Sequence, residues 1–95
     1  MTVRNILEAE LEILEAVTFY QERAGDIASD FFTEFRKARE EIKAFPEFWR
    51  EVGGGYRRRL IERYPYGIIY RIKGEEVQIV ALAHTSREPG YWKGR

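Results

Sequence analysis

The chain has 95 residues, of which 44% are hydrophobic, 15% aromatic and 34% charged, and it contains no cysteine. This length suits a single domain over residues 1–95, and the apolar content argues against a disordered chain. The lack of cysteine excludes disulfides, thiol catalysis and thiolate metal sites. Because neither a signal-peptide pattern nor an apolar run of about 20 residues is present, we expect a cytoplasmic protein without a membrane span.

The net charge of zero hides a division along the chain. Residues 1–48 carry 6 Lys and Arg against 11 Asp and Glu, a balance of −5, whereas residues 49–95 carry 10 against 5, a balance of +5. Such an asymmetry is typical of a basic half that binds an anionic partner, either a nucleic acid or an acidic protein segment. It is equally typical of two halves that neutralise each other within the fold.

The first half of the sequence predicts a helix after "TVRNI", which can form a short opening strand. Leu7, Leu11 and Leu14 recur at helical spacing, which indicates an amphipathic helix with these leucines on its apolar stripe. We expect this helix to end near Ala24. Gly25 suits the left-handed position that follows a helix, and the next residue, an aspartate, can cap a second one.

The second predicted helix carries the clearest pattern in the chain. Its apolar stripe consists of Ile27, Phe31, Phe35, Ala38, Ile42 and Phe45. Pro46 disfavours helical geometry at the residue before it, so the helix should stop at Phe45. Two helices joined by a tight turn form a helical hairpin, whose apolar face needs a cover.

Three glycines at 53–55 predict a loop, and beyond it the apolar period changes from 3.6 to 2. Strands are predicted at residues 56–63, 66–72 and 77–83, with Lys73-Gly74-Glu75 as the hairpin connection between the last two. The architecture that follows is α+β, an N-terminal helical hairpin packed on a small, mostly antiparallel sheet of three or four strands.

The sequence lacks the motifs of several common catalytic sites. "GGGYRRR" has no GK[ST] ending and opens no helix, there is a single histidine, and neither serine lies in a nucleophile elbow. We therefore expect no metal site and no cofactor.

Consecutive arginines on the first predicted main strand are one group of candidate binding residues. Side chains alternate along a strand, so Arg57, Arg59 and Arg63 should share one face and Arg58 the other, with Leu60. Three arginines at this spacing can bind phosphates through bidentate hydrogen bonds. They can also be solubilising charges that pair with Glu51, Glu62 or acidic side chains of the helices.

The C-terminal stretch "HTSREPGYW" holds the second group. His84 at the end of the last strand can act as a general acid or base, with Arg87 stabilising a phosphate, as RNA cleavage requires. Alternatively, the imidazole only hydrogen-bonds the tail to the sheet. Tyr91 can stack on a base or pack against the protein, and we expect Trp92 to fill a gap in the core.

The order of elements, together with R-x-L-x-x-R-Y-P-Y-x-I-x-Y and the later H-x-x-R-x-P-x-Y-W, resembles the RelE/ParE superfamily of toxins from bacterial type II toxin–antitoxin modules. The resemblance covers nearly the whole chain. It implies a protein that stops growth and is held inactive by a cognate antitoxin, whose flexible segment wraps the toxin. A homodimer or a toxin–antitoxin hetero-oligomer is compatible with this expectation.

One fold serves two targets in this superfamily, since RelE-like members cut messenger RNA in the ribosome and ParE-like members poison DNA gyrase without nuclease activity. Our first expectation is a ribosome-dependent mRNA endoribonuclease, because His84 lies beside Arg87 where several nuclease members carry active groups. The candidate catalytic residues are then His84, Arg87 and Arg63, and the candidate contacts to RNA or another target are Arg57, Arg58, Arg59 and Tyr91. The resemblance implies such roles for those that match family positions, namely Arg57, Arg58, Arg63, His84 and Arg87. The alternatives are a gyrase inhibitor and a non-toxic module member that binds only its antitoxin.

Overall fold

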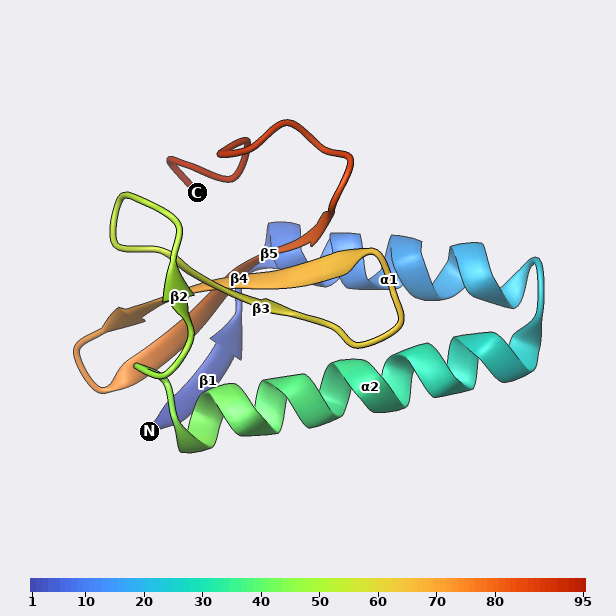
Figure 1. Ribbon diagram of the computed structural model, residues 1–95, viewed down its shortest axis with the longest axis horizontal. Coiled ribbons are helices and arrows are strands. Elements are labelled where there is room, and N and C mark those ends of the chain that lie inside the picture. Colours follow the sequence, from blue (N-terminus) through green and yellow to red (C-terminus); the bar gives the residue numbers. More distant parts are fainter.

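The computed structural model describes residues 1–95 and contains two helices and five strands (Figure 1). In chain order the elements are β1 (Thr2–Asn5), α1 (Leu7–Gln21), α2 (Gly25–Ala44), β2 (Arg50–Glu51), β3 (Arg57–Leu60), β4 (Tyr66–Lys73) and β5 (Glu76–His84). The two helices form an antiparallel hairpin that covers one face of the sheet, so the predicted α+β architecture is confirmed.

The sheet has the strand order β1-β5-β4-β3-β2, and only the β1–β5 pair is parallel. It has five strands where the sequence predicts three or four. The opening strand does form, and β2 adds a pair of residues that is too short to show any alternation. Gly74 takes a positive φ of 63° between β4 and β5, as the predicted hairpin connection requires.

The outward face of α1 contradicts the expected apolar stripe. Leu7, Leu11 and Leu14 are all exposed, and the face that packs on the protein consists of Ala9, Ile13 and Ala16. Because alanine has a small side chain, this face allows α1 to pack close to β5 and α2. A row of leucines on this face would increase the distance between the helix and these elements. Periodicity alone identifies two apolar sides of this helix without saying which one is covered.

The turn between the helices also differs from the prediction. α1 ends at Gln21, and Ala24 is the extended residue that precedes α2, so Gly25 is the first helical residue and takes no left-handed conformation. The following Asp26 lies in the first turn, where its carboxylate meets the positive end of the helix dipole, and caps no amide.

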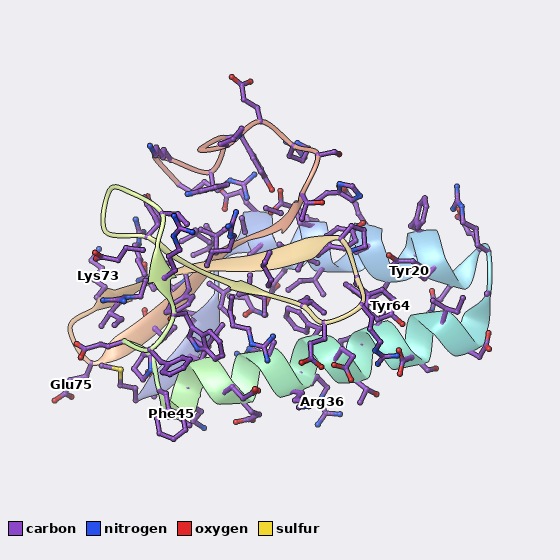
Figure 2. All side chains as sticks on the ribbon, in the orientation of Figure 1. Tyr20, Arg36, Phe45, Tyr64, Lys73 and Glu75 are labelled. Atoms are coloured by element: carbon purple, nitrogen blue, oxygen red, sulfur yellow. The ribbon has the colours of Figure 1, made fainter.

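The stripe of α2 is buried along its middle, at Phe31, Phe35, Ala38 and Ile42. Its two ends, Ile27 and Phe45, remain exposed, and the helix stops at Ala44 before the predicted Pro46 break. Near the turn that joins the two helices, Tyr20 of α1 packs against Tyr64 of the β3–β4 turn, with ring centroids 5.4 Å apart (Figure 2).

The sheet is apolar on both faces, and a different part of the chain packs on each face. On the helix side, Ile68, Tyr70 and Ile79 pack with α1 and α2. On the opposite side, the segment after β5 turns back over the sheet (Figure 1), and Trp92 packs there, as predicted. The remaining members of this second cluster are Tyr56, Ile69, Val80, Ala81 and Ala83.

Candidate functional site

The predicted arginine stripe stops at Arg59, because the strand ends before Arg63. β3 ends at Leu60, and Arg63 lies in the following turn with a positive φ of 68°, so it does not continue the alternation of Arg57 and Arg59. The prediction that Arg63 belongs to the strand is therefore wrong. An arginine gives no local signal for this left-handed backbone, which is uncommon for residues other than glycine.

Arg59 points to the helix side, where it is almost fully buried. Its Nη2 donates to both carboxylate oxygens of Glu41 on α2, at 2.9 and 3.0 Å, and Nη1 donates to the carbonyl oxygen of Leu60. The guanidinium carbon also lies 4.8 Å from the ring centroid of Trp49. The charge of Arg59 is thus neutralised inside the fold.

Arg57 lies on the same side and holds the segment before β2. Its Nη1 donates to the carbonyl oxygens of Glu47 and Trp49, at 3.0 and 2.8 Å, and its Nη2 lies 3.9 Å from Glu51. These contacts fix the chain after Pro46 against the sheet.

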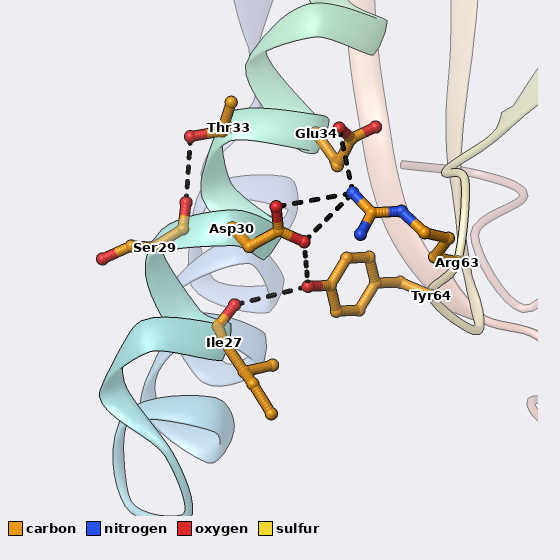
Figure 3. Close-up of polar contacts among 7 residues, drawn as sticks. All are labelled: Ile27, Ser29, Asp30, Thr33, Glu34, Arg63 and Tyr64. Atoms are coloured by element: carbon orange, nitrogen blue, oxygen red, sulfur yellow. Dashed lines mark hydrogen bonds and ion pairs between the residues drawn. The ribbon is translucent and has the colours of Figure 1, made fainter.

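Arg63 and Tyr64 tie the β3–β4 turn to α2 (Figure 3). Arg63 Nη2 lies 3.1 Å from Asp30 Oδ2 and 3.2 Å from Glu34 Oε1, and the Tyr64 hydroxyl donates to Asp30 Oδ2 at 2.5 Å. The hydrogen bond from Tyr64 and the nearby Arg63 hold the pKa of Asp30 below its usual value. Burial, with the bond to Asp30, raises the pKa of Tyr64 to about 12.

The opposite face of the sheet carries a small pocket of about 70 Å³ that brings together four of the predicted site residues, Arg58, His84, Arg87 and Tyr91. Arg58 reaches it across Gly67, where a Cβ atom would lie 3.1 Å from the arginine Cγ. Arg87 stacks on Tyr91, with its guanidinium carbon 3.9 Å from the ring centroid. Arg57, Arg59 and Arg63 are not part of this pocket.

His84 is half-buried at the end of β5, where its ring meets the edge of Tyr66. Its Nδ1 accepts the backbone N–H of Ser86 at 3.0 Å, and the Ser86 hydroxyl lies 2.7 Å from the same atom. Because a backbone N–H can only donate, Nδ1 holds the lone pair of the neutral ring and Nε2 holds the proton. The one atom of this ring that can take a proton is therefore already occupied.

Glu12 of α1 is a central residue that sequence reasoning missed. It accepts the Tyr91 hydroxyl at 2.7 Å, Arg95 Nη1 at 2.8 Å and the backbone N–H of Leu82 at 3.2 Å. Burial and the bond to Glu12 raise the pKa of Tyr91. No local pattern predicts this role, because the partners lie 70 to 83 residues away along the chain.

Of the acidic partners predicted for the arginines, Glu51 does pair with Arg57 and Glu62 forms no ion pair, while those on the helices were predicted only as a class. The individual positions, Asp30, Glu34 and Glu41, follow one face of α2 at intervals of four and seven residues. No group of three or more His, Asp or Glu side chains is arranged to hold a metal ion. Neither helix is long and apolar enough to cross a membrane.

Comparison with known proteins identifies the family of this chain and solved structures of similar fold. Residues 7–89 match the family model described as the ParE toxin of the type II toxin–antitoxin system parDE. The fold is similar to a chain of the chromosomal ParDE toxin–antitoxin system from P. aeruginosa, with a TM-score of 0.71 and 20% identity over 88% of this chain and 95% of that one. A search of curated proteins returned no match. Because the family model spans most of the sequence, this chain belongs to the ParE toxin family of type II toxin–antitoxin systems.

Proposed function

We propose that this ParE-family toxin arrests growth in the cytoplasm by inhibiting DNA gyrase and does not cut RNA. The family match favours this alternative over the RelE-like nuclease that we first expected, since ParE-like members of the superfamily poison gyrase. A ParDE system also implies a cognate ParD antitoxin as the partner that holds the toxin inactive.

The observation that carries the proposal is the state of His84. A nuclease that uses this histidine as its base needs a free lone pair facing the 2′-hydroxyl, but Nδ1 is occupied by the Ser86 amide and Nε2 carries the proton. Arg63, the third predicted catalytic residue, is held on α2 by two carboxylates. His84 therefore offers no free base in this conformation, and Arg63 does not reach the pocket that His84 lines.

The target contacts that we propose are Arg58, Arg87 and Tyr91. They line the pocket on the face opposite the helices, and neither Arg58 nor Arg87 forms an ion pair within the chain. In this proposal Arg57, Arg59 and Arg63 serve the fold, because their guanidinium groups are already bound to carbonyl oxygens or carboxylates.

A nuclease remains the second candidate because Arg58, His84 and Arg87 line one pocket. It would require the imidazole to leave Ser86 when RNA binds. The third candidate is a module member that only binds its antitoxin. This function requires neither gyrase inhibition nor RNA cleavage.

The deciding experiment compares the wild-type chain with His84→Gln and Arg58→Ala in two assays. Purified gyrase is assayed for supercoiling and DNA cleavage, and cellular mRNA 5′ ends are mapped after induction. Gyrase inhibition is expected with wild type and His84→Gln and reduced with Arg58→Ala, while mRNA 5′ ends stay unchanged. New 5′ ends that disappear in His84→Gln, with unaffected gyrase, would establish the nuclease. If the wild-type chain is expressed without growth arrest and has no effect in either assay, the third candidate, a module member that only binds its antitoxin, would be supported.

A further inference from the structure

The outward face of α1 carries an apolar stripe that nothing in the chain covers. Leu7, Leu11 and Leu14 are 67%, 50% and 62% exposed. They follow one another at intervals of four and three residues and so lie on one line along the helix. Single exposed leucines are ordinary, but three in a row on one helix face form a patch typical of a binding surface.

A row of glutamates runs beside the leucine stripe. Glu8, Glu15 and Glu22 repeat at intervals of seven residues, which places them on a line parallel to the leucines, and Glu10 lies on the other flank. All four side chains are exposed, and none forms an ion pair within the chain. The surface is thus a leucine stripe bordered by unpaired carboxylates.

A second copy of the chain is the wrong occupant for this surface. Two such helices packed leucine to leucine in antiparallel orientation would bring each glutamate row against its own copy, and in parallel orientation the row would face Glu10. Both arrangements place like charges beside each other on the flanks, where coiled coils use opposite charges to select their partners.

We propose that the outward face of α1 binds an amphipathic helix of a partner protein, with apolar side chains on the leucine stripe and Lys or Arg residues facing Glu8, Glu15 and Glu22. Such a helix would supply apolar contact at Leu7, Leu11 and Leu14 and opposite charge at the flank. The surface lies on the opposite side of α1 from the face that packs on the sheet, so it is separate from the pocket proposed to contact the target.

The test uses the full-length chain and an 18-residue helical peptide with leucines at positions 4, 8, 11 and 15 and lysines on both flanks. Binding is measured by fluorescence anisotropy, and amide shifts of the ¹⁵N-labelled chain locate the site. Two control peptides carry glutamate in place of lysine, or the same residues in scrambled order. The chain variants are Glu8→Gln/Glu15→Gln/Glu22→Gln and Leu7→Gln/Leu11→Gln/Leu14→Gln, with Phe45→Gln/Phe48→Gln as the matched exposed apolar control.

The expected result is binding of the lysine peptide with shifts confined to α1. The glutamate variant should bind about tenfold more weakly, since each exposed charge pair contributes modestly. The leucine variant should lose binding, and the phenylalanine control should bind like wild type, with circular dichroism confirming that all variants fold. Equal binding of a control peptide, shifts outside α1, no binding at millimolar peptide, or a dimer of the free chain that the leucine variant abolishes would each overturn the proposal. Gyrase plays no part in the assay, so this proposal and the proposed function can fail separately.

Discussion

Glu12 and Arg95 form an ion pair of 2.8 Å between the first helix and the last residue of the chain. The same guanidinium donates to the carbonyl oxygen of Val80 at 3.0 Å, and the same carboxylate accepts the amide of Leu82 at 3.2 Å. The pair therefore joins three segments that are far apart in sequence: α1, β5 and the C-terminal tail.

Glu12→Gln should destabilise the fold by about 1–3 kcal/mol, because it leaves the partly buried Arg95 without its charge partner. The free energy of unfolding measured with urea checks the magnitude, and faster hydrogen exchange at Leu82 checks the location. Glu10→Gln on the exposed side of the same helix is the control and should change stability by less than about 0.5 kcal/mol. Equal effects of the two variants would show that the ion pair contributes nothing.

Asp30→Asn should flatten the acid limb of the stability curve. The pKa of Asp30 is lowered in the folded chain, so its ionised form stabilises the fold above the unfolded pKa, near pH 4. That contribution disappears as the pH falls through the lowered folded pKa. Unfolding free energies measured between about pH 2 and 6 should therefore fall less steeply with acid in Asp30→Asn than in wild type. Glu62→Gln, an exposed carboxylate of the same turn with no ion pair, should keep the wild-type slope.

Trp92→Ala should cost about 3–5 kcal/mol, as large buried aromatic truncations do, because Trp92 fills the second face of the sheet. Trp92→Phe should cost less than Trp92→Ala, because the phenyl ring still fills part of the space that the indole occupies. Thermal unfolding of both variants measures the difference. Similar losses in the two would mean that the indole group makes a contact beyond packing.

Gly67→Ala should displace Arg58 while leaving the sheet intact. The added methyl group would lie 3.1 and 3.2 Å from Arg58 Cγ and Cδ, a distance that the flexible side chain relieves by moving aside. Gyrase inhibition should therefore weaken with Gly67→Ala, as with Arg58→Ala, at nearly unchanged melting temperature. Arg36→Ala on the exposed side of α2 is the control (Figure 2) and should inhibit like wild type. Full inhibition by the glycine variant with a displaced Arg58 would remove Arg58 from the target contacts.

The elements that could be predicted are those whose signal is local. The buried middle of α2 and the turn at Gly74 follow from spacing and turn chemistry alone. The covered side of α1 could not be predicted, since the buried face carries Ala9 and Ala16 while the more hydrophobic leucines are exposed. Nor could the left-handed backbone at Arg63, which the contacts to Asp30 and Glu34 stabilise after the chain has folded.

The same limit applies to the candidate site. Alternation correctly placed Arg58 on the face opposite Arg57 and Arg59, and the end of β5 correctly received His84. The occupation of Nδ1 by the Ser86 amide depends on the conformation of one turn, which the sequence does not specify. Which arginines remain free depends on acidic residues contributed by a different helix.

We expect the contacts of Glu12 and Arg95 to limit aggregation of the chain as well. β1 pairs with β5 only as far as Ile79, so the backbone groups of Val80 and Leu82 lie beyond its reach on an open stretch of strand. Unpaired backbone of this kind is where strands of separate molecules add to one another. Since Arg95 and Glu12 occupy the Val80 carbonyl and the Leu82 amide, a chain shortened by its final residue should precipitate more readily at high concentration, although its core would be unchanged.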